Sequence, residues 1–200
     1  PRSRFHGSTV PIPTQRIVKL PMKKIRIKDK TFETYLSEAQ LEQRIKELGA
    51  QICADFEGEE LVVLGVLNGS FLFLADLVRA ISLPLSCEFI KISSYSGMES
   101  TGKVTEVIGI PPSLSGKNVV IVEDIVDTGK SMAYLLDQLA TFHPKRVAIA
   151  TLLFKKEAFT FNYPLDYVGF EIPNKFVVGF GLDYDGAGRN YTDIYQLSIP

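Results

Sequence analysis

The chain has few of the residues that build disulfide frameworks and histidine metal sites. Among its 200 residues there are two cysteines, Cys53 and Cys87, and two histidines, His6 and His143. The cysteines form no Cys-x-x-Cys pair, so we expect both to be reduced and buried, as in a cytoplasmic protein. The histidines are too few and too far apart for a histidine metal site, and His143 precedes Pro144 at a predicted turn.

The chain also lacks an excess of one charge and any long hydrophobic run. Its 22 basic and 23 acidic residues give a formal net charge of −1, which provides no basic surface for nucleic acid. No apolar run is long enough to span a bilayer and no signal-peptide pattern opens the chain, so we expect no membrane partner and a cytoplasmic location. With 46% hydrophobic residues, the length fits one domain with a substantial core.

The first 21 residues differ in composition from the rest. They contain four prolines, no initiator Met and no amphipathic period. We therefore expect residues 1–21 to be an N-terminal tail or a cloning remnant, and residues 22–200 to form a single domain. Between Lys23 and Lys28, isoleucine alternates with basic residues, which favours a strand with one wet face over a nucleic-acid patch.

Predicted strands and helices alternate along the domain, a pattern typical of an α/β protein with a parallel sheet. Ser37-Glu38-Ala39-Gln40 is a capping box that opens a helix with Leu41, Ile45, Leu48 and Ile52 on one face. Buried strands are predicted over 61–67, 85–92, 146–154 and 166–171, and a second helix over 70–81. The segment 93–103 is rich in Ser and Gly and breaks the pattern, so we expect a mobile loop.

The most informative segment is VVIVEDIVDTGKS, residues 119–131. Its apolar start is typical of a buried parallel strand, and Glu123 and Asp124 are predicted to follow the end of that strand. Asp127 comes next, and residues 128–131 form a small polar loop that opens an amphipathic helix. The first amides of a helix lack intrahelical partners and bind anions. Acids repel a phosphate unless a divalent cation or a hydroxyl-rich sugar lies between, so the segment predicts a site for a sugar phosphate bound with magnesium.

Two other interpretations of this segment are weaker. Gly129-Lys130-Ser131 matches the end of a Walker P-loop, but that motif needs a glycine five residues before Gly129, where this chain has Asp124. The segment could also be an ordinary strand and helix joined by solvated acids. The order Glu-Asp-x-x-Asp-Thr-Gly at a strand end is unusually specific for such a turn.

The segment resembles the phosphoribosyl-diphosphate signature of the purine phosphoribosyltransferases, most closely that of the hypoxanthine-guanine members. Further stretches between residues 37 and 199 resemble that family in order and spacing: Leu67-Asn68-Gly69-Ser70, Ser94-Tyr95, Ser100-Thr101-Gly102, LLFKK at 152–156 and VGFEIPNKFVVGFGLDY at 168–184. The resemblance implies an α/β, type I phosphoribosyltransferase-like fold: a central, mostly parallel sheet flanked by helices, with a small hood and a mobile loop. It also implies purine salvage, the Mg²⁺-dependent transfer of phosphoribosyl from phosphoribosyl diphosphate to hypoxanthine or guanine.

The resemblance assigns expected roles around the phosphoribosyl diphosphate. Glu123 and Asp124 match acids that hold the ribose hydroxyls and the associated metal, and Asp183 matches an acid that holds a second magnesium. Asp127 matches the catalytic acid beside the purine N7, where a carboxylate can take or share a proton. The other matches bind the 5′-phosphate (Thr128, Gly129, Lys130, Ser131) or lie at the pyrophosphate (Leu67, Asn68, Gly69, Ser94, Tyr95, Arg189).

The expected base pocket lies in the last third of the chain. Lys155 matches the lysine that donates to the purine 6-oxo group, which favours a carbonyl and disfavours adenine. Phe176 matches the aromatic residue that stacks on the base, and Val177 the position whose backbone contacts the base edge. Asn68 and Ser93 stand where members of the family carry basic residues, and these changes are expected to affect pyrophosphate affinity rather than the reaction class. The loop at Asn68 often follows a non-proline cis peptide in this family.

Two alternative functions remain to be weighed. A relative with the same fold that regulates transcription or binds RNA would not need Asp127, Lys155, Phe176 and Asp183 together. An orotate-specific or adenine-specific enzyme is disfavoured by Lys155 and by the KFVVGF segment. The sequence does not rank hypoxanthine, guanine and xanthine, because much of the 2-position is contacted by backbone. The resemblance further implies a homodimer or a homotetramer.

Overall fold

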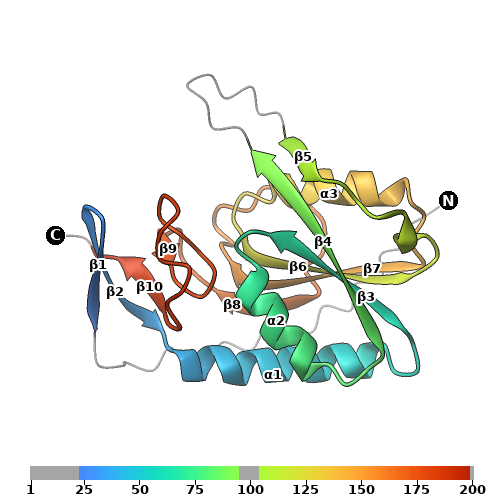
Figure 1. Ribbon diagram of the computed structural model, residues 1–200, viewed down its shortest axis with the longest axis horizontal. Helices are drawn as coiled ribbons and strands as arrows, with labels where there is room; N and C mark the ends of the chain where they lie inside the picture. Colours follow the sequence, from blue (N-terminus) through green and yellow to red (C-terminus); the bar gives the residue numbers. More distant parts are fainter. Residues whose placement is uncertain (1–22, 95–103, 199–200) are drawn as a thin grey trace.

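A computed structural model describes residues 23–94 and 104–198. The described residues form a six-stranded sheet with helices on both faces and a four-stranded sheet beside it (Figure 1). The predicted tail, residues 1–21, lies outside the described residues, and so do Tyr95 and the rest of the predicted mobile loop up to Lys103. The two residues that begin this loop in the prediction, Ser93 and Ser94, belong to a strand.

The large sheet has the strand order β5-β4-β3-β6-β7-β8, and every neighbouring pair is parallel except β4 with β5. The predicted α/β class and mostly parallel sheet are confirmed. Strand β5 was not predicted, and β4 is two residues longer than predicted. The strands are β3 (Leu61–Leu67), β4 (Leu85–Ser94), β5 (Val104–Ile108), β6 (Asn118–Val126), β7 (Arg146–Phe154) and β8 (Tyr167–Glu171).

Helices cover both faces of this sheet. Side chains of α1 (Glu38–Asp55) and α2 (Phe71–Ala80) share one core with Val63 and Val120, whereas side chains of α3 (Lys130–Ala140) share another core with Val62 and Ile121. Alternate residues of the central strands therefore face opposite layers, as in strands that are buried on both sides. A short 3₁₀ helix, η1 (Pro112–Leu114), precedes β6. Within the described residues, no helix is both long enough and apolar enough to cross a membrane.

The first helix begins where its sequence predicts. The Ser37 hydroxyl accepts a hydrogen bond from the Gln40 amide at 3.3 Å, and the Gln40 side chain accepts one from the Ser37 amide at 3.1 Å. The four residues predicted to form its apolar face, Leu41, Ile45, Leu48 and Ile52, are all buried. Helix α1 also lies tightly against α2, because a Cβ on Gly49 would come within 2.6 Å of the Ala80 side chain.

The small sheet is the expected hood, and it joins distant parts of the chain. Its strand order is β1-β2-β10-β9, all antiparallel, with β1 (Lys24–Ile27), β2 (Lys30–Leu36), β9 (Val177–Val178) and β10 (Ile194–Leu197). The strand predicted near Ile25 is confirmed as β1, and the other three strands were not predicted. Ile27, Phe32, Val178 and Tyr195 form the core of the hood.

One predicted boundary is wrong. Glu123 and Asp124 do not follow the end of their strand, because β6 continues to Val126. On one side β6 keeps pairing with β7 as far as Val126, whereas on the other side its pairing with β3 ends at Val122. The two acids therefore lie in the part of β6 that no longer pairs with β3.

The expected burial of both cysteines is wrong for Cys87. Cys87 is exposed and Cys53 is partly buried, and both are free thiols. Phe89, two residues along β4 and so on the same face as Cys87, is 44% exposed. This part of β4 lies outside the pairing with β5, which starts at Lys91. The described residues thus leave an apolar part of β4 uncovered.

Candidate active site

The carboxyl ends of β3, β6 and β7 bring three predicted site segments together. The first segment, residues 67–69, begins at the last residue of β3. The second, residues 123–131, runs from the end of β6 into the start of α3, and the third, Lys155, directly follows β7. Ligands of open parallel sheets bind at this edge, where the loops leave the strands. The parallel order β3-β6-β7 makes these segments neighbours, although up to 88 residues separate them in sequence.

The phosphate loop, residues 128–131, leaves the start of α3 open. Gly129 is the N-cap residue, with φ of 87°, and has no side chain to cap the helix, while the Lys130 amide donates to the Thr128 hydroxyl in a long hydrogen bond of 3.4 Å. The first helical hydrogen bond joins the Ala133 amide to the Gly129 carbonyl at 3.0 Å. A cavity of about 120 Å³ lies at this point, lined by Glu123, Asp127 and the loop. Uncapped amides at the positive end of a helix beside a cavity can bind an anion.

Glu123 and Asp124 form a pair of acids beside this loop. Burial, and next the charge of Asp124, raise the pKa of Glu123 well above its ordinary value. Burial also raises the pKa of Asp124, although a hydrogen bond with the Glu123 side chain, a 2.8 Å bond from the Ile125 amide and the positive Arg189 oppose the rise. Within the described residues neither acid has an ion pair with Lys or Arg. Two adjacent, poorly solvated carboxylates are therefore left for a cation or for hydroxyl donors of a ligand.

The loop after β3 lies directly against Asp124. A Cβ on Gly69 would be 1.5 Å from the Asp124 carboxylate, so only glycine fits there. The Gly69 carbonyl also leaves no room for a side chain at Gly181, because a Cβ at that position would lie 2.0 Å from the carbonyl oxygen. The peptide bond between Leu67 and Asn68 is cis, as the family resemblance implied. The close contacts at Gly69 join the loop after β3 to Asp124 on one side and to the C-terminal segment at Gly181 on the other.

Lys155 and Asp127 lie side by side. The Lys155 ammonium is 2.7 Å from a carboxylate oxygen of Asp127. The lysine side chain is 10% exposed, whereas the aspartate side chain is 44% exposed. The backbone fixes this arrangement, because the Lys155 amide donates to the Val126 carbonyl at 2.9 Å. The pair offers a ligand a hydrogen-bond donor and a proton acceptor at adjacent positions.

Asp183 lies in a separate ion pair. Its carboxylate is 2.7 Å from the Arg189 guanidinium and accepts from the Gly186 amide at 2.7 Å. Arg189 also donates to the Gly181 carbonyl at 2.6 Å, which ties this segment to the close contact at Gly69. The described residues contain no group of three or more His, Cys, Asp or Glu side chains that could hold a metal.

The donor set around β6 nevertheless fits magnesium. Mg²⁺ is usually bound by one or two carboxylates together with water and substrate phosphates, rather than by a cage of protein groups. Glu123 and Asp124 supply two carboxylates whose raised pKa values a bound cation would lower again. Asp183 does not join them in one cluster.

The hood supplies an aromatic surface. Phe176 is 45% exposed, and its ring packs against Phe32 and Tyr184 at centroid distances of 6.3 and 5.8 Å. Val177 follows in β9 and pairs with Gln196 of β10. An aromatic ring that is anchored on one side and exposed on the other can stack on a planar ligand. Of the two site residues expected in the predicted mobile loop, Ser94 ends β4 and Tyr95 lies outside the described residues.

Sequence reasoning missed the residues that support the phosphate loop. The Tyr163 hydroxyl donates to the Gly129 carbonyl at 2.8 Å, and the Thr160 amide donates to the Thr128 carbonyl at 3.3 Å. Burial, and next the charge of Glu123, raise the pKa of the Tyr163 hydroxyl, which keeps it a donor. These residues lie about 30 positions from the loop in an irregular segment, and no motif marked them.

Comparison with known proteins gives one consistent result. Residues 32–185 match the phosphoribosyl transferase domain. The chain is 41% identical to the hypoxanthine-guanine phosphoribosyltransferase of Aquifex aeolicus over 178 residues, which are 88% of this chain and 99% of that protein. It is 41% identical to the hypoxanthine phosphoribosyltransferase of Escherichia coli over 84% of this chain and 97% of that one.

Solved structures agree. A crystal structure of a hypoxanthine-guanine phosphoribosyltransferase from Bacillus anthracis superposes with a TM-score of 0.78 at 43% identity, covering 87% of this chain and all of that one. A hypoxanthine phosphoribosyltransferase from Staphylococcus aureus gives a TM-score of 0.78 at 39% identity, over 83% of this chain and 91% of that one.

Proposed function

We infer that this chain, which belongs to the hypoxanthine-guanine phosphoribosyltransferase family, is an enzyme of purine salvage. It transfers the phosphoribosyl group of phosphoribosyl diphosphate to hypoxanthine or guanine and gives IMP or GMP and pyrophosphate. The observation that carries the assignment of substrate is the Lys155–Asp127 pair, 2.7 Å apart, next to the uncapped start of α3.

The 5′-phosphate binds at residues 128–131. The N-cap residue Gly129 makes no side-chain cap, and the Thr128 hydroxyl accepts from the Lys130 amide only at 3.4 Å. The cavity beside these amides is lined by Thr128, Lys130 and Ser131. From this anchor the ribose extends toward Glu123 and Asp124, whose carboxylates accept hydrogen bonds from its hydroxyls. Fixing both ends of the sugar holds its C1 in place for attack by the base.

Asp127 and Lys155 bind one edge of the purine. The 6-oxo group and N7 are neighbours on this edge, as the ammonium and the carboxylate are neighbours in the site. Lys155 donates to the 6-oxo oxygen, while Asp127 accepts or shares the N7 proton as the base becomes a better nucleophile. Adenine presents a donor where Lys155 also donates, so the pair selects 6-oxopurines. Phe176 stacks on the base, and the backbone at Val177 contacts its other edge.

The pyrophosphate leaves between the loop at residues 67–69 and the C-terminal segment. Gly69 and Gly181 bring these two segments together, and Arg189 places positive charge on the C-terminal side. Magnesium, bound by Glu123 and Asp124 together with the diphosphate, would supply positive charge against the leaving group. Asp183 is proposed to hold a second magnesium, which requires its carboxylate to be shared with Arg189.

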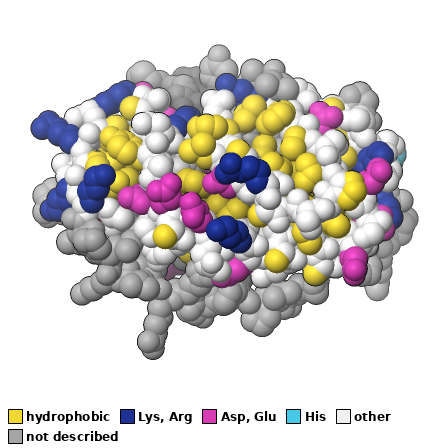
Figure 2. All heavy atoms as spheres, turned by 60° about the horizontal axis from the view of Figure 1, so that its bottom comes forward, with side chains coloured by type: hydrophobic (Ala, Val, Ile, Leu, Met, Phe, Trp, Pro, Cys, Tyr) yellow, Lys and Arg dark blue, Asp and Glu magenta, His cyan; other side chains and the backbone are white. Residues whose placement is uncertain are grey.

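The domain, its assembly and its location are further proposals. Residues 22–200 act as one domain, because β2 near one end of the chain pairs with β10 near the other. A homodimer or homotetramer would cover apolar groups such as Phe71 and Phe89, which are 40% and 44% exposed. Figure 2, which brings the α1 side forward, shows hydrophobic side chains between charged ones on that face. Two free cysteines fit a reducing compartment, so we propose a cytoplasmic location.

The test is an absorbance assay with phosphoribosyl diphosphate, magnesium and one base at a time. Hypoxanthine and guanine should be converted, and adenine and orotate should give almost no product. Turnover of adenine comparable to that of hypoxanthine would overturn the role of Lys155. Conversion of none of the four bases would overturn the proposed function.

A further inference from the structure

The carbonyl of Gly129 holds the geometry of the phosphate loop. This carbonyl accepts two hydrogen bonds, one from the Ala133 amide at 3.0 Å and one from the Tyr163 hydroxyl at 2.8 Å. The C=O of Gly129 and the N–H of Lys130 belong to one planar peptide and point in opposite directions. A donor that fixes the carbonyl on one side therefore fixes the direction of the Lys130 amide on the other. That amide donates to the Thr128 hydroxyl at 3.4 Å, a long hydrogen bond that a closer phosphate oxygen can replace.

The surroundings hold the Tyr163 hydroxyl at this carbonyl. A Cβ on Gly129 would lie 2.6 Å from the Phe159 ring and 2.7 Å from the Tyr163 hydroxyl oxygen, so the two aromatic side chains occupy the space that a side chain at position 129 would need. Phe159 packs edge-on against Tyr163 at a centroid distance of 5.1 Å and against Phe154 at 5.3 Å. Phe154 is the last residue of β7, so this aromatic row ties the tyrosine to the sheet.

A second contact holds the preceding residue of the loop. The Thr160 amide and hydroxyl both lie 3.3 Å from the Thr128 carbonyl. Thr160 and Tyr163 thus hold two successive carbonyls, Thr128 and Gly129, from the same side. The segment begins at Lys155, whose own amide bonds to Val126, so it connects the base lysine to the phosphate loop.

We propose that Tyr163 is a positioning residue for the 5′-phosphate, because its hydroxyl holds the Gly129 carbonyl and thereby directs the Lys130 amide toward the phosphate. Tyr163 does not touch the substrate in this arrangement. This inference rests on the proposed function and adds a residue and a mechanism to it. It predicts a defect that depends on the presence of the 5′-phosphate and not on the base.

The test compares IMP with inosine, which lacks the phosphate, by calorimetric titration of Tyr163→Phe and the unaltered chain. Loss of one hydrogen bond should lower the ratio of IMP affinity to inosine affinity by about two- to tenfold. In the forward reaction, the KM for phosphoribosyl diphosphate should rise while the KM for hypoxanthine stays the same. Thr160→Ala, which removes only the exposed hydroxyl, should lower the IMP-to-inosine affinity ratio by a smaller factor. This variant replaces Tyr163→Phe in the test if Tyr163→Phe does not fold.

Tyr167→Phe is the matched control. It also removes one tyrosine hydroxyl bond, here 2.7 Å to the Asp55 carboxylate at the opposite edge of the sheet. It should lower the melting temperature and leave the IMP-to-inosine ratio unchanged. Equal losses of IMP and inosine affinity in Tyr163→Phe, or no change in either, would overturn the inference alone. Failure of the unaltered chain to bind IMP would overturn the proposed function and this inference together.

Discussion

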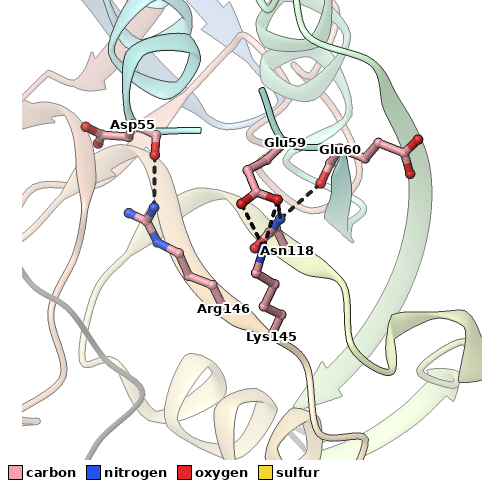
Figure 3. Close-up of polar contacts among 6 residues, drawn as sticks. All are labelled: Asp55, Glu59, Glu60, Asn118, Lys145 and Arg146. Atoms are coloured by element: carbon pink, nitrogen blue, oxygen red, sulfur yellow. Dashed lines mark hydrogen bonds and ion pairs between the residues drawn. The ribbon is translucent and has the colours of Figure 1, made fainter. Parts of the chain in front are cut away.

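Charged side chains gather at both edges of the parallel sheet, but those at the amino edge are paired with one another, whereas the acids Glu123 and Asp124 at the carboxyl edge have no basic partner in an ion pair within the described residues. At the amino edge the charges and polar groups have partners (Figure 3). Lys145 lies 2.7 Å from Glu59, Asn118 donates to Glu59 at 3.1 Å, and Arg146 donates to the Asp55 carbonyl at 3.1 Å. The hydrogen bond from Lys145, followed by that from Asn118, lowers the pKa of Glu59.

At the carboxyl edge the acids lie next to one another. Burial and repulsion by Asp124 raise the pKa of Glu123, and burial also raises the pKa of Asp124. At the amino edge, by contrast, Glu59 has partners within the chain that lower its pKa. The difference indicates that the amino edge stabilises the fold, whereas the carboxyl edge is arranged for charges that arrive with a ligand.

The largest expected effect at the carboxyl edge is that of Asp127→Asn. Asparagine keeps the size of the side chain but cannot take a proton from the base, so kcat should fall by about 10²- to 10⁴-fold, more than the KM for the diphosphate rises. Single-turnover measurements separate this loss from slow product release. An unchanged rate of the chemical step would contradict the role of Asp127.

Lys155→Gln should have the next largest effect. Loss of a charged hydrogen bond to the 6-oxo group should lower kcat/KM for hypoxanthine by about 10- to 100-fold. Lys156→Gln is the control, because this neighbouring side chain is 69% exposed and lies 3.7 Å from Glu171, away from Asp127. If both substitutions reduced kcat/KM equally, the loss would come from general charge and not from recognition of the base.

At the amino edge, Asn118→Ala should affect stability alone. The Asn118 side chain is buried and donates to both Glu59 and the Glu60 carbonyl. Its removal should lower the free energy of unfolding by about 1–2 kcal/mol, measured by urea denaturation, while kcat and KM stay unchanged. A kinetic defect in a variant that remains folded would show that the two edges are not independent.

The sequence predicted local features of the fold well and long-range ones poorly. The capping box at Ser37 and the uninterrupted apolar run of β7 are local signals, and both elements occur where predicted. Strand β2 pairs with β10 between the two ends of the chain, and β9 in turn pairs with β10; no local pattern reports either pairing. The end of β6 was misplaced because acids usually end a buried strand, whereas here pairing with β7 carries the strand past them.

The residues of the site also divide into those that local motifs predicted and those that only long-range packing brings together. Residues within the segment 123–131 and Lys155 were identified from motifs, and the structure brings them together. The contacts at Gly69, Gly181 and Tyr163 depend on segments 30 to more than 100 residues apart. Such contacts follow from the packing of loops and could not be inferred from residue type or spacing.

Glu123 and Glu59 allow the difference between the two edges to be tested directly by pH. The pKa of Glu123 is raised in the folded chain, so the folded state binds its proton more tightly than the unfolded state, and this residue lowers stability as pH rises through the raised pKa. The pKa of Glu59 is lowered, so its contribution is present above the ordinary value of 4.5 and is lost as pH falls. Burial also raises the pKa of Asp166, but this contribution is common to any variants compared.

The most direct measurement is the melting temperature of Glu123→Gln and Glu59→Gln without ligand at neutral pH, together with their rates of IMP formation. Both substitutions replace a carboxylate with a neutral group of the same shape. Glu123→Gln should melt higher than the unaltered chain, with a weaker dependence on pH, and should lose most of its activity. Glu59→Gln should melt no higher than the unaltered chain and keep its activity. Shifts of the same sign in both variants, or full activity in Glu123→Gln, would contradict the account.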